Sequence, residues 1–193
     1  MAPAASTLAT LLADLAAGDL ASLHAHLSGR RTRGSTSLTA QLDGRLETDT
    51  QDTLLTWAAR HGQAEAARLL LEAGASVGAT DGGGRAALLA ACYQGHLECV
   101  RLLLEASAAV NQAADSGATP LLAACYQGRL ECARLLLEAS AAVDQADTRG
   151  TTPLFFACQE GHVDIARLLI EAGAAVSQAR NDGTTPLPIA CKQ

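Results

Sequence analysis

A unit of 33 residues repeats along most of this chain of 193 residues, and the repeat limits the folds open to it. Residues 88–113 recur as residues 121–146, and only three of the 26 positions differ. One glycine keeps the same spacing through four units, at Gly62, Gly95, Gly128 and Gly161. A short repeated unit cannot bury its apolar face alone and must stack on its neighbours. The sequence therefore predicts a solenoid with a continuous core.

Each unit reads as a turn, a short helix, a tight turn and a longer helix. Residues 147–150 form the turn, and Thr152 with Pro153 supplies an N-cap and a proline for the first helical position. A second apolar segment begins near His162 and stops at Gly173, where a left-handed residue can end a helix. Aromatic residues make up only 3% of the chain, which disfavours a β-sandwich or barrel. We therefore expect an all-α fold.

The stretch 150–169 carries the pattern G-x-T-P-L-x-x-A-C-x-x-G-H followed by L-L, and at 33-residue spacing it resembles the ankyrin repeat. The resemblance implies an all-α, ankyrin-type helix-turn-helix repeat solenoid with short hairpin-like turns. It divides the chain into a degenerate N-terminal helical capping repeat (1–29), a mobile insertion or linker (30–47), repeats at 48–80, 81–113, 114–146 and 147–179, and a partial repeat (180–193).

Three positions depart from the repeat pattern. Ala86 stands where the other units have a threonine N-cap, and this loss costs roughly 1 kcal/mol. Ser107 and Ser140 replace the glycines that end the other second helices at positions 74 and 173. A serine in the left-handed region adds a strain of about 1 kcal/mol.

The six cysteines follow the repeat, with Cys92, Cys125, Cys158 and Cys191 at one position and Cys99 and Cys132 at another. Stacked helices lie about 8 to 10 Å apart, whereas zinc needs all its ligands within about 2.3 Å of one centre. We therefore interpret the thiols as apolar core side chains, and we predict no metal and no cofactor. No nucleophile with its base and no phosphate-binding loop can be placed, so we predict that the chain is not an enzyme.

Charge and hydropathy limit the kinds of partner and the cellular location that we expect for this chain. The chain has 14 Lys and Arg against 20 Asp and Glu, a net charge of −6, which disfavours nucleic acid and acidic membranes. No apolar run approaches the roughly 18 to 20 residues that span a bilayer, and the N-terminus lacks the features of a secretory signal. We expect a cytoplasmic protein, with the nucleus as a second possibility, that is a monomer in isolation and takes no small-molecule substrate.

Arginine and glutamate also follow the repeat on the second helices. Arg68, Arg101, Arg134 and Arg167 each precede a glutamate by four residues. They form a charge ladder whose exposed pairs contribute only about 0.3 to 0.5 kcal/mol each, and the order of arginine before glutamate is the weaker one. We therefore interpret this face as a solvated outer face.

The candidate binding face lies on the first helices, where Leu89 and Tyr93 stand four residues apart, as do Leu122 and Tyr126. The resemblance implies that this face lines a concave groove and that the groove and the hairpin tips contact partners. The predicted partner-binding residues are Arg60, His61, Arg85, Leu89, Tyr93, Gln94, Leu122, Tyr126, Gln127, Arg149, Phe155, Gln159 and Glu160. An alternative for Leu89, Leu122 and Phe155 is that they pack between repeats, because a sandwiched helix is apolar all round.

We accordingly predict a non-enzymatic protein-protein interaction module, a scaffold or adaptor, that binds an unidentified protein or peptide. One alternative is a regulatory subunit or fragment of a larger enzyme or signalling protein. The other is a structural spacer.

Overall fold

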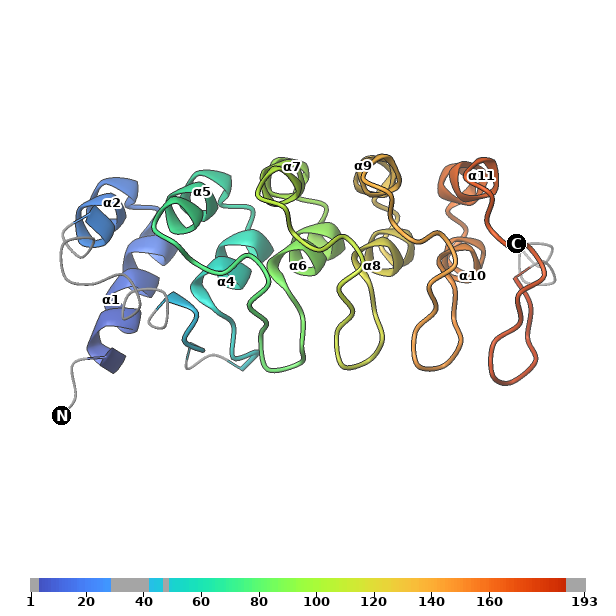
Figure 1. Ribbon diagram of the computed structural model, residues 1–193, viewed down its shortest axis with the longest axis horizontal. Helices are drawn as coiled ribbons and strands as arrows, with labels where there is room; N and C mark the ends of the chain where they lie inside the picture. The colour runs from blue at the N-terminus through green and yellow to red at the C-terminus, as the bar shows by residue number, and fades with distance from the viewer. Residues whose placement is uncertain (1–3, 29–41, 47–48, 187–193) are drawn as a thin grey trace.

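The computed structural model describes residues 4–28, 42–46 and 49–186, and in these ranges the regular elements are helices in two layers (Figure 1). The first layer holds α4 (Leu54–Arg60), α6 (Ala87–Gln94), α8 (Pro120–Tyr126) and α10 (Pro153–Gln159). The second layer holds α2 (Leu20–Ser28), α5 (Ala64–Glu72), α7 (Leu97–Glu105), α9 (Leu130–Glu138) and α11 (Val163–Glu171). α1 (Ala4–Ala17) packs against α2 at the N-terminal end. The predicted all-α helix-turn-helix solenoid is confirmed.

Threonine side chains start three of the four first-layer helices. The hydroxyls of Thr53, Thr119 and Thr152 each accept a hydrogen bond from the backbone N–H three residues later, at 3.1 to 3.2 Å. Ala86 adopts the same extended conformation before α6 but has no side chain to cap it. The missing cap expected from the sequence is confirmed.

The second helices end on residues in the left-handed region. Gly74 and Gly173 have φ of +97° and +89°, and Ser107 and Ser140 occupy the equivalent positions at +63° and +65°. The left-handed serines expected from the sequence are therefore present. Each carries the steric strain of a Cβ atom in this region.

Replacing Ser107 or Ser140 by glycine is expected to raise the free energy of unfolding by about 0.5 to 1 kcal/mol each. The gain is the relief of left-handed strain, reduced by the greater entropy of glycine in the unfolded chain. Urea denaturation measures it. Ser107→Ala, which keeps the strain, serves as the control. Equal stabilities of the glycine and alanine variants would contradict the explanation.

The core runs between the two layers and consists mainly of leucine, alanine and cysteine. Cys92, Cys99, Cys125 and Cys132 are buried free thiols. Burial raises the pKa of Cys92 well above its usual value and that of Cys99 to about 11, so both stay protonated. The described residues contain no group of three or more His, Cys, Asp or Glu that could hold a metal ion. Cys191 lies outside the described residues.

The N-terminal helix pair covers the first full repeat. Leu11 and Leu15 of α1 are buried in the common core, and Gln63 donates a hydrogen bond to the Leu15 carbonyl at 2.8 Å. Leu42 and Leu46, which belong to the predicted mobile insertion of residues 30–47, are also buried in that core. Residues 29–41 and 47–48 lie outside the described part of the chain. The boundaries of the units remain a prediction.

The charged ladder on the second layer differs from its prediction. Arg68 does pair with Glu72 four residues later. Arg101, Arg134 and Arg167 instead approach the acid three residues earlier, at 3.8 to 3.9 Å. The reason is that helical side chains lean toward the N-terminus, so each guanidinium covers the preceding turn. These exposed pairs contribute little to stability.

None of the described helices combines the length and the hydropathy that a membrane-crossing segment requires.

Candidate partner-binding groove

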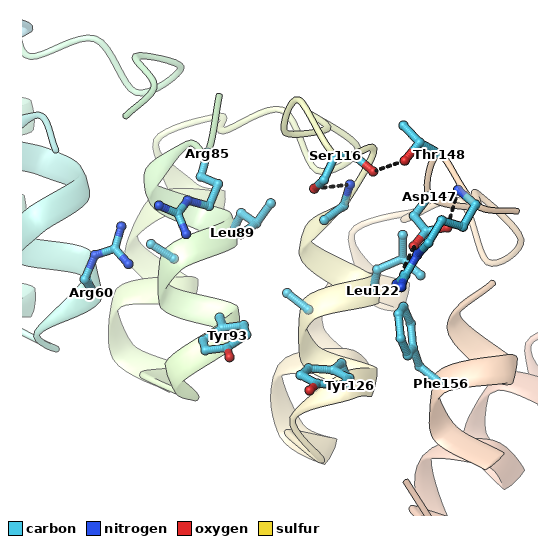
Figure 2. A pocket seen from close by; sticks show the side chains of 14 residues that line it. Arg60, Arg85, Leu89, Tyr93, Ser116, Leu122, Tyr126, Asp147, Thr148 and Phe156 are labelled. Atoms are coloured by element: carbon cyan, nitrogen blue, oxygen red, sulfur yellow. Dashed lines mark hydrogen bonds and ion pairs between the residues drawn. The ribbon is translucent and has the colours of Figure 1, made fainter. Parts of the chain in front are cut away.

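A hollow of about 540 Å³ lies where the first-layer helices meet the loops that precede them (Figure 2). We call this surface the groove. Helices α4, α6, α8 and α10 contribute Arg60, Leu89, Ala90, Tyr93, Leu122, Ala123, Tyr126 and Phe156. The loops contribute Arg85, Ser116, Ala118, Asp147, Thr148 and Arg149. The groove thus takes residues from four consecutive repeats.

An aromatic row forms one side of the groove. Tyr93 and Tyr126 stack with ring centroids 6.4 Å apart and planes inclined by 28°. Phe156 meets the Tyr126 ring edge-on at 5.3 Å. The two tyrosines are 40% and 41% exposed, so the row has free surface. It arises because the tyrosines occupy the same position in consecutive repeats.

Two alanines make the groove deep. Ala90 and Ala123 stand at the repeat position that carries Trp57 in the first repeat and Phe156 in the fourth. Trp57 stacks on His61 with centroids 4.0 Å apart. Because the two middle repeats have only a methyl group at this position, the space beside the tyrosines stays open.

Leu89, Leu122 and Phe155 are buried, with 4%, 1% and 1% of their surface exposed. The alternative of packing between repeats therefore describes them. Leu89 and Leu122 still border the hollow, whereas Phe155 does not, and Phe156 takes the place expected for it. Phe155, which was predicted to line the groove, lies on another face of α10, a helix that is apolar on several sides. The guanidinium of Arg180 lies 5.0 Å from the Phe155 ring centroid.

Buried carboxylates hold two arginines at one end of the groove. Arg60 donates to Asp52 at 2.8 Å and to Asp81 at 3.1 Å, and Arg85 donates to Asp81 at 2.7 Å. The other Asp81 oxygen accepts from the backbone N–H groups of Gly83 and Arg85, both at 2.9 Å. Asp81 is fully buried and Arg85 is 37% exposed. This network was not predicted from the sequence, although Asp81 shares its repeat position with Asp147.

The same arrangement recurs two repeats later. Asp147 accepts two hydrogen bonds from the Arg149 guanidinium, at 3.1 and 3.2 Å. Its other oxygen accepts from the backbone N–H groups of Arg149 and Thr151. Burial tends to raise the pKa of Asp147, but the hydrogen bonds from Thr151 and Arg149 outweigh it and hold the pKa below its ordinary value. Asp147 therefore remains a carboxylate beneath an exposed guanidinium.

Hydrogen bonds between repeats set the spacing of the groove residues. His96, Arg129 and His162 each follow the glycine that recurs every 33 residues. Their side chains donate to carbonyls of the preceding repeat, at 3.1 to 3.4 Å. The acceptors are the carbonyls of Arg60, Tyr93 and Tyr126. The backbone of each groove position is thus tied to the next repeat.

The remaining predicted site residues lie at the ends of the first-layer helices, beside the hollow. His61, Gln94, Gln159 and Glu160 are exposed, and Gln127 is half-buried. Gln159 donates to Glu160 at 2.7 Å, and it lines a smaller hollow with Arg180. These residues extend the surface around the groove without forming its floor.

The stacked helix pairs and projecting loops define a helical repeat protein. The family model described as ankyrin repeats (3 copies) matches residues 55–147 and 139–193. The chain belongs to the ankyrin repeat family. Ankyrin repeats are general protein-protein interaction modules, and the family is typically non-enzymatic. The comparison with curated proteins finds no match.

Proposed function

We propose that this chain is a non-enzymatic scaffold or adaptor that binds a protein or peptide through the groove and the hairpin tips. The observation that carries the proposal is the row of Tyr93, Tyr126 and Phe156 beside an open hollow. Tyrosine is favoured at interfaces because it brings apolar area and a hydrogen-bonding hydroxyl on few rotatable bonds. A partner side chain in the hollow would bury the exposed part of both rings.

The groove suits binding because it is formed before a partner arrives. Its helices are packed on the core, and hydrogen bonds between repeats hold its backbone. A rigid surface loses little conformational entropy on association. The described free cysteines fit a reducing compartment, and we place the protein in the cytoplasm, with the nucleus as the alternative.

Replacing Tyr93 and Tyr126 together by alanine is expected to weaken partner binding by about tenfold or more, because both rings are hot-spot candidates along the side of the groove. The measurement is affinity capture from a native lysate, with retained proteins quantified for the wild-type chain and for the variant. Urea unfolding of both chains first shows that they are equally folded.

The matched control is Arg101→Gln/Arg134→Gln, which changes the same two repeats on the second-layer helices. We expect this variant to retain the partner. Equal retention by the tyrosine variant and the wild-type chain would contradict the groove assignment. Capture of no protein by the wild-type chain would favour the structural spacer.

A further inference from the structure

We propose that the occupant of the groove is an extended acidic peptide segment, in which a bulky apolar side chain enters the hollow between two carboxylates. This inference rests on the proposed function and names the chemistry of the partner. Its basis is the arrangement of charge around an apolar floor.

The groove presents cations outward and keeps the matching anions underneath. Arg85 and Arg149 have 37% and 63% of their side chains exposed, whereas Asp81 and Asp147 have 0% and 8%. An approaching ligand therefore meets guanidinium groups first. The chain as a whole is acidic, with a net charge of −6, whereas the cations of the groove are matched by the carboxylates beneath them.

Both guanidinium groups have N–H donors without an acceptor in the described part of the chain. Arg85 uses its Nε for Asp81, and neither of its terminal nitrogens has an acceptor among the described residues. Arg149 uses Nε and Nη2 for Asp147, which leaves Nη1 free within that same part of the chain. A carboxylate matches the geometry of a guanidinium and forms short, charge-assisted hydrogen bonds with it.

The positions of the two arginines set the spacing of the ligand. Arg85 precedes α6 and Arg149 precedes α10, two repeats further on. Helices packed about 8 to 10 Å apart place them roughly 16 to 20 Å from one another. An extended chain rises about 3.3 Å per residue, so we expect the two acidic residues to stand roughly five or six positions apart.

Between the two arginines the groove is apolar. Ala90 and Ala123 leave the hollow open. Tyr93, Tyr126 and Phe156 line its side (Figure 2). A leucine or aromatic side chain of the peptide can fill this space. A cationic side chain is disfavoured there because it would leave water for an apolar floor whose outward polar groups are donors.

The ion pairs also argue for a carboxylate ligand over a nucleic acid. Each outward arginine is already balanced by a buried aspartate, so the groove has directed donors but little excess positive charge. Binding a phosphate backbone depends on an excess of cations that displaces counterions.

The test selects peptides from a random library on the folded wild-type chain and measures their affinities by fluorescence polarisation. We expect the selected peptides to carry two acidic residues at this spacing around a leucine or aromatic residue. Arg85→Gln/Arg149→Gln should weaken their binding about tenfold or more. The Arg101→Gln/Arg134→Gln control should stay within about twofold.

A second measurement leaves the protein unchanged. Replacing the two acidic residues of a selected peptide by asparagine and glutamine should weaken its binding to the wild-type chain by a similar factor. Because the protein is the wild-type chain, this measurement is independent of any effect of the arginine substitutions on folding.

Three outcomes would overturn the inference. Peptides that need Tyr93 and Tyr126 but are not acidic would refute it while leaving the proposed function intact. Selection of no peptide that depends on the tyrosines would refute both. Tighter binding of a labelled oligothymidine than of any peptide, lost in the Arg85→Gln/Arg149→Gln variant, would replace the peptide by a nucleic acid.

Discussion

Asp81→Ala is expected to lower the free energy of unfolding by about 3 kcal/mol. The carboxylate is fully buried and accepts hydrogen bonds from two guanidinium groups and two backbone N–H groups. Removing one partner of a buried ion pair costs about 3 to 5 kcal/mol. We expect the lower end, because Arg60 keeps Asp52 and Arg85 is partly exposed to water.

The measurement is urea unfolding, with Asp147→Ala as the matched control. Asp147 occupies the same repeat position, but the arginine that pairs with it, Arg149, is 63% exposed, so a smaller loss is expected. The backbone accepts alanine there, since Ala114 stands at this position in the intervening repeat. Asp81→Asn, which keeps one acceptor for the backbone N–H groups, should recover part of the loss. Equal effects of Asp81→Ala and Asp147→Ala would contradict the role of the buried network.

Gly117→Ala is the second substitution with a large expected effect. We expect it to lower the free energy of unfolding by about 3 kcal/mol. Gly117 has a φ of +78°, and a Cβ atom on it would lie 2.7 Å from the backbone nitrogen of Thr148. The left-handed conformation costs an alanine about 1 to 2 kcal/mol, and the backbone clash adds about 1 to 3 kcal/mol. Neither loop can relax freely, because the Thr148 N–H donates to the Ser116 carbonyl at 3.1 Å.

Gly173→Ala separates the two contributions. Its φ is +89°, but no neighbouring atom lies within 4 Å of an added Cβ, so only the conformational cost of about 1 to 2 kcal/mol applies. Thermal or urea unfolding of both variants gives the comparison. If Gly117→Ala loses no more stability than Gly173→Ala, the contact between adjacent loops is not the source of the constraint.

The helical solenoid could be predicted because its determinants recur in every unit. Threonine caps such as Thr152, and the glycines that end the second helices, act within a few residues of the chain. Their effects can be seen in a linear sequence. The missing cap at Ala86 and the left-handed Ser107 were predictable for the same reason.

The groove was predicted only in part, because its details depend on how helices rotate when they stack. Tyr93 and Tyr126 were identified, whereas Phe155 was chosen where Phe156 lines the hollow. α10 offers apolar residues on several faces, so spacing alone could not orient it. Comparing repeat positions would have helped, since Trp57 and Phe156 align with two alanines.

The charged network around Asp81 was harder to predict from the sequence than the groove. Its members come from separate segments, with Asp52 before α4, Arg60 at the end of α4, and Asp81 in the loop between α5 and α6. Only the packing of one repeat on another brings these charges together. Arg101 on the outer face approaches Glu98 and not the glutamate four residues later, for a similar reason. The direction in which its side chain points along the helix decides which carboxylate it contacts.

The most direct test of the groove as the binding surface is hydrogen exchange of the wild-type chain with and without its captured partner. We predict that exchange slows in the loops around Arg85 and Arg149 and in helices α6, α8 and α10, while α7 and α9 remain unchanged. Slowing confined to α7 and α9 would place the partner on the opposite layer and contradict the account.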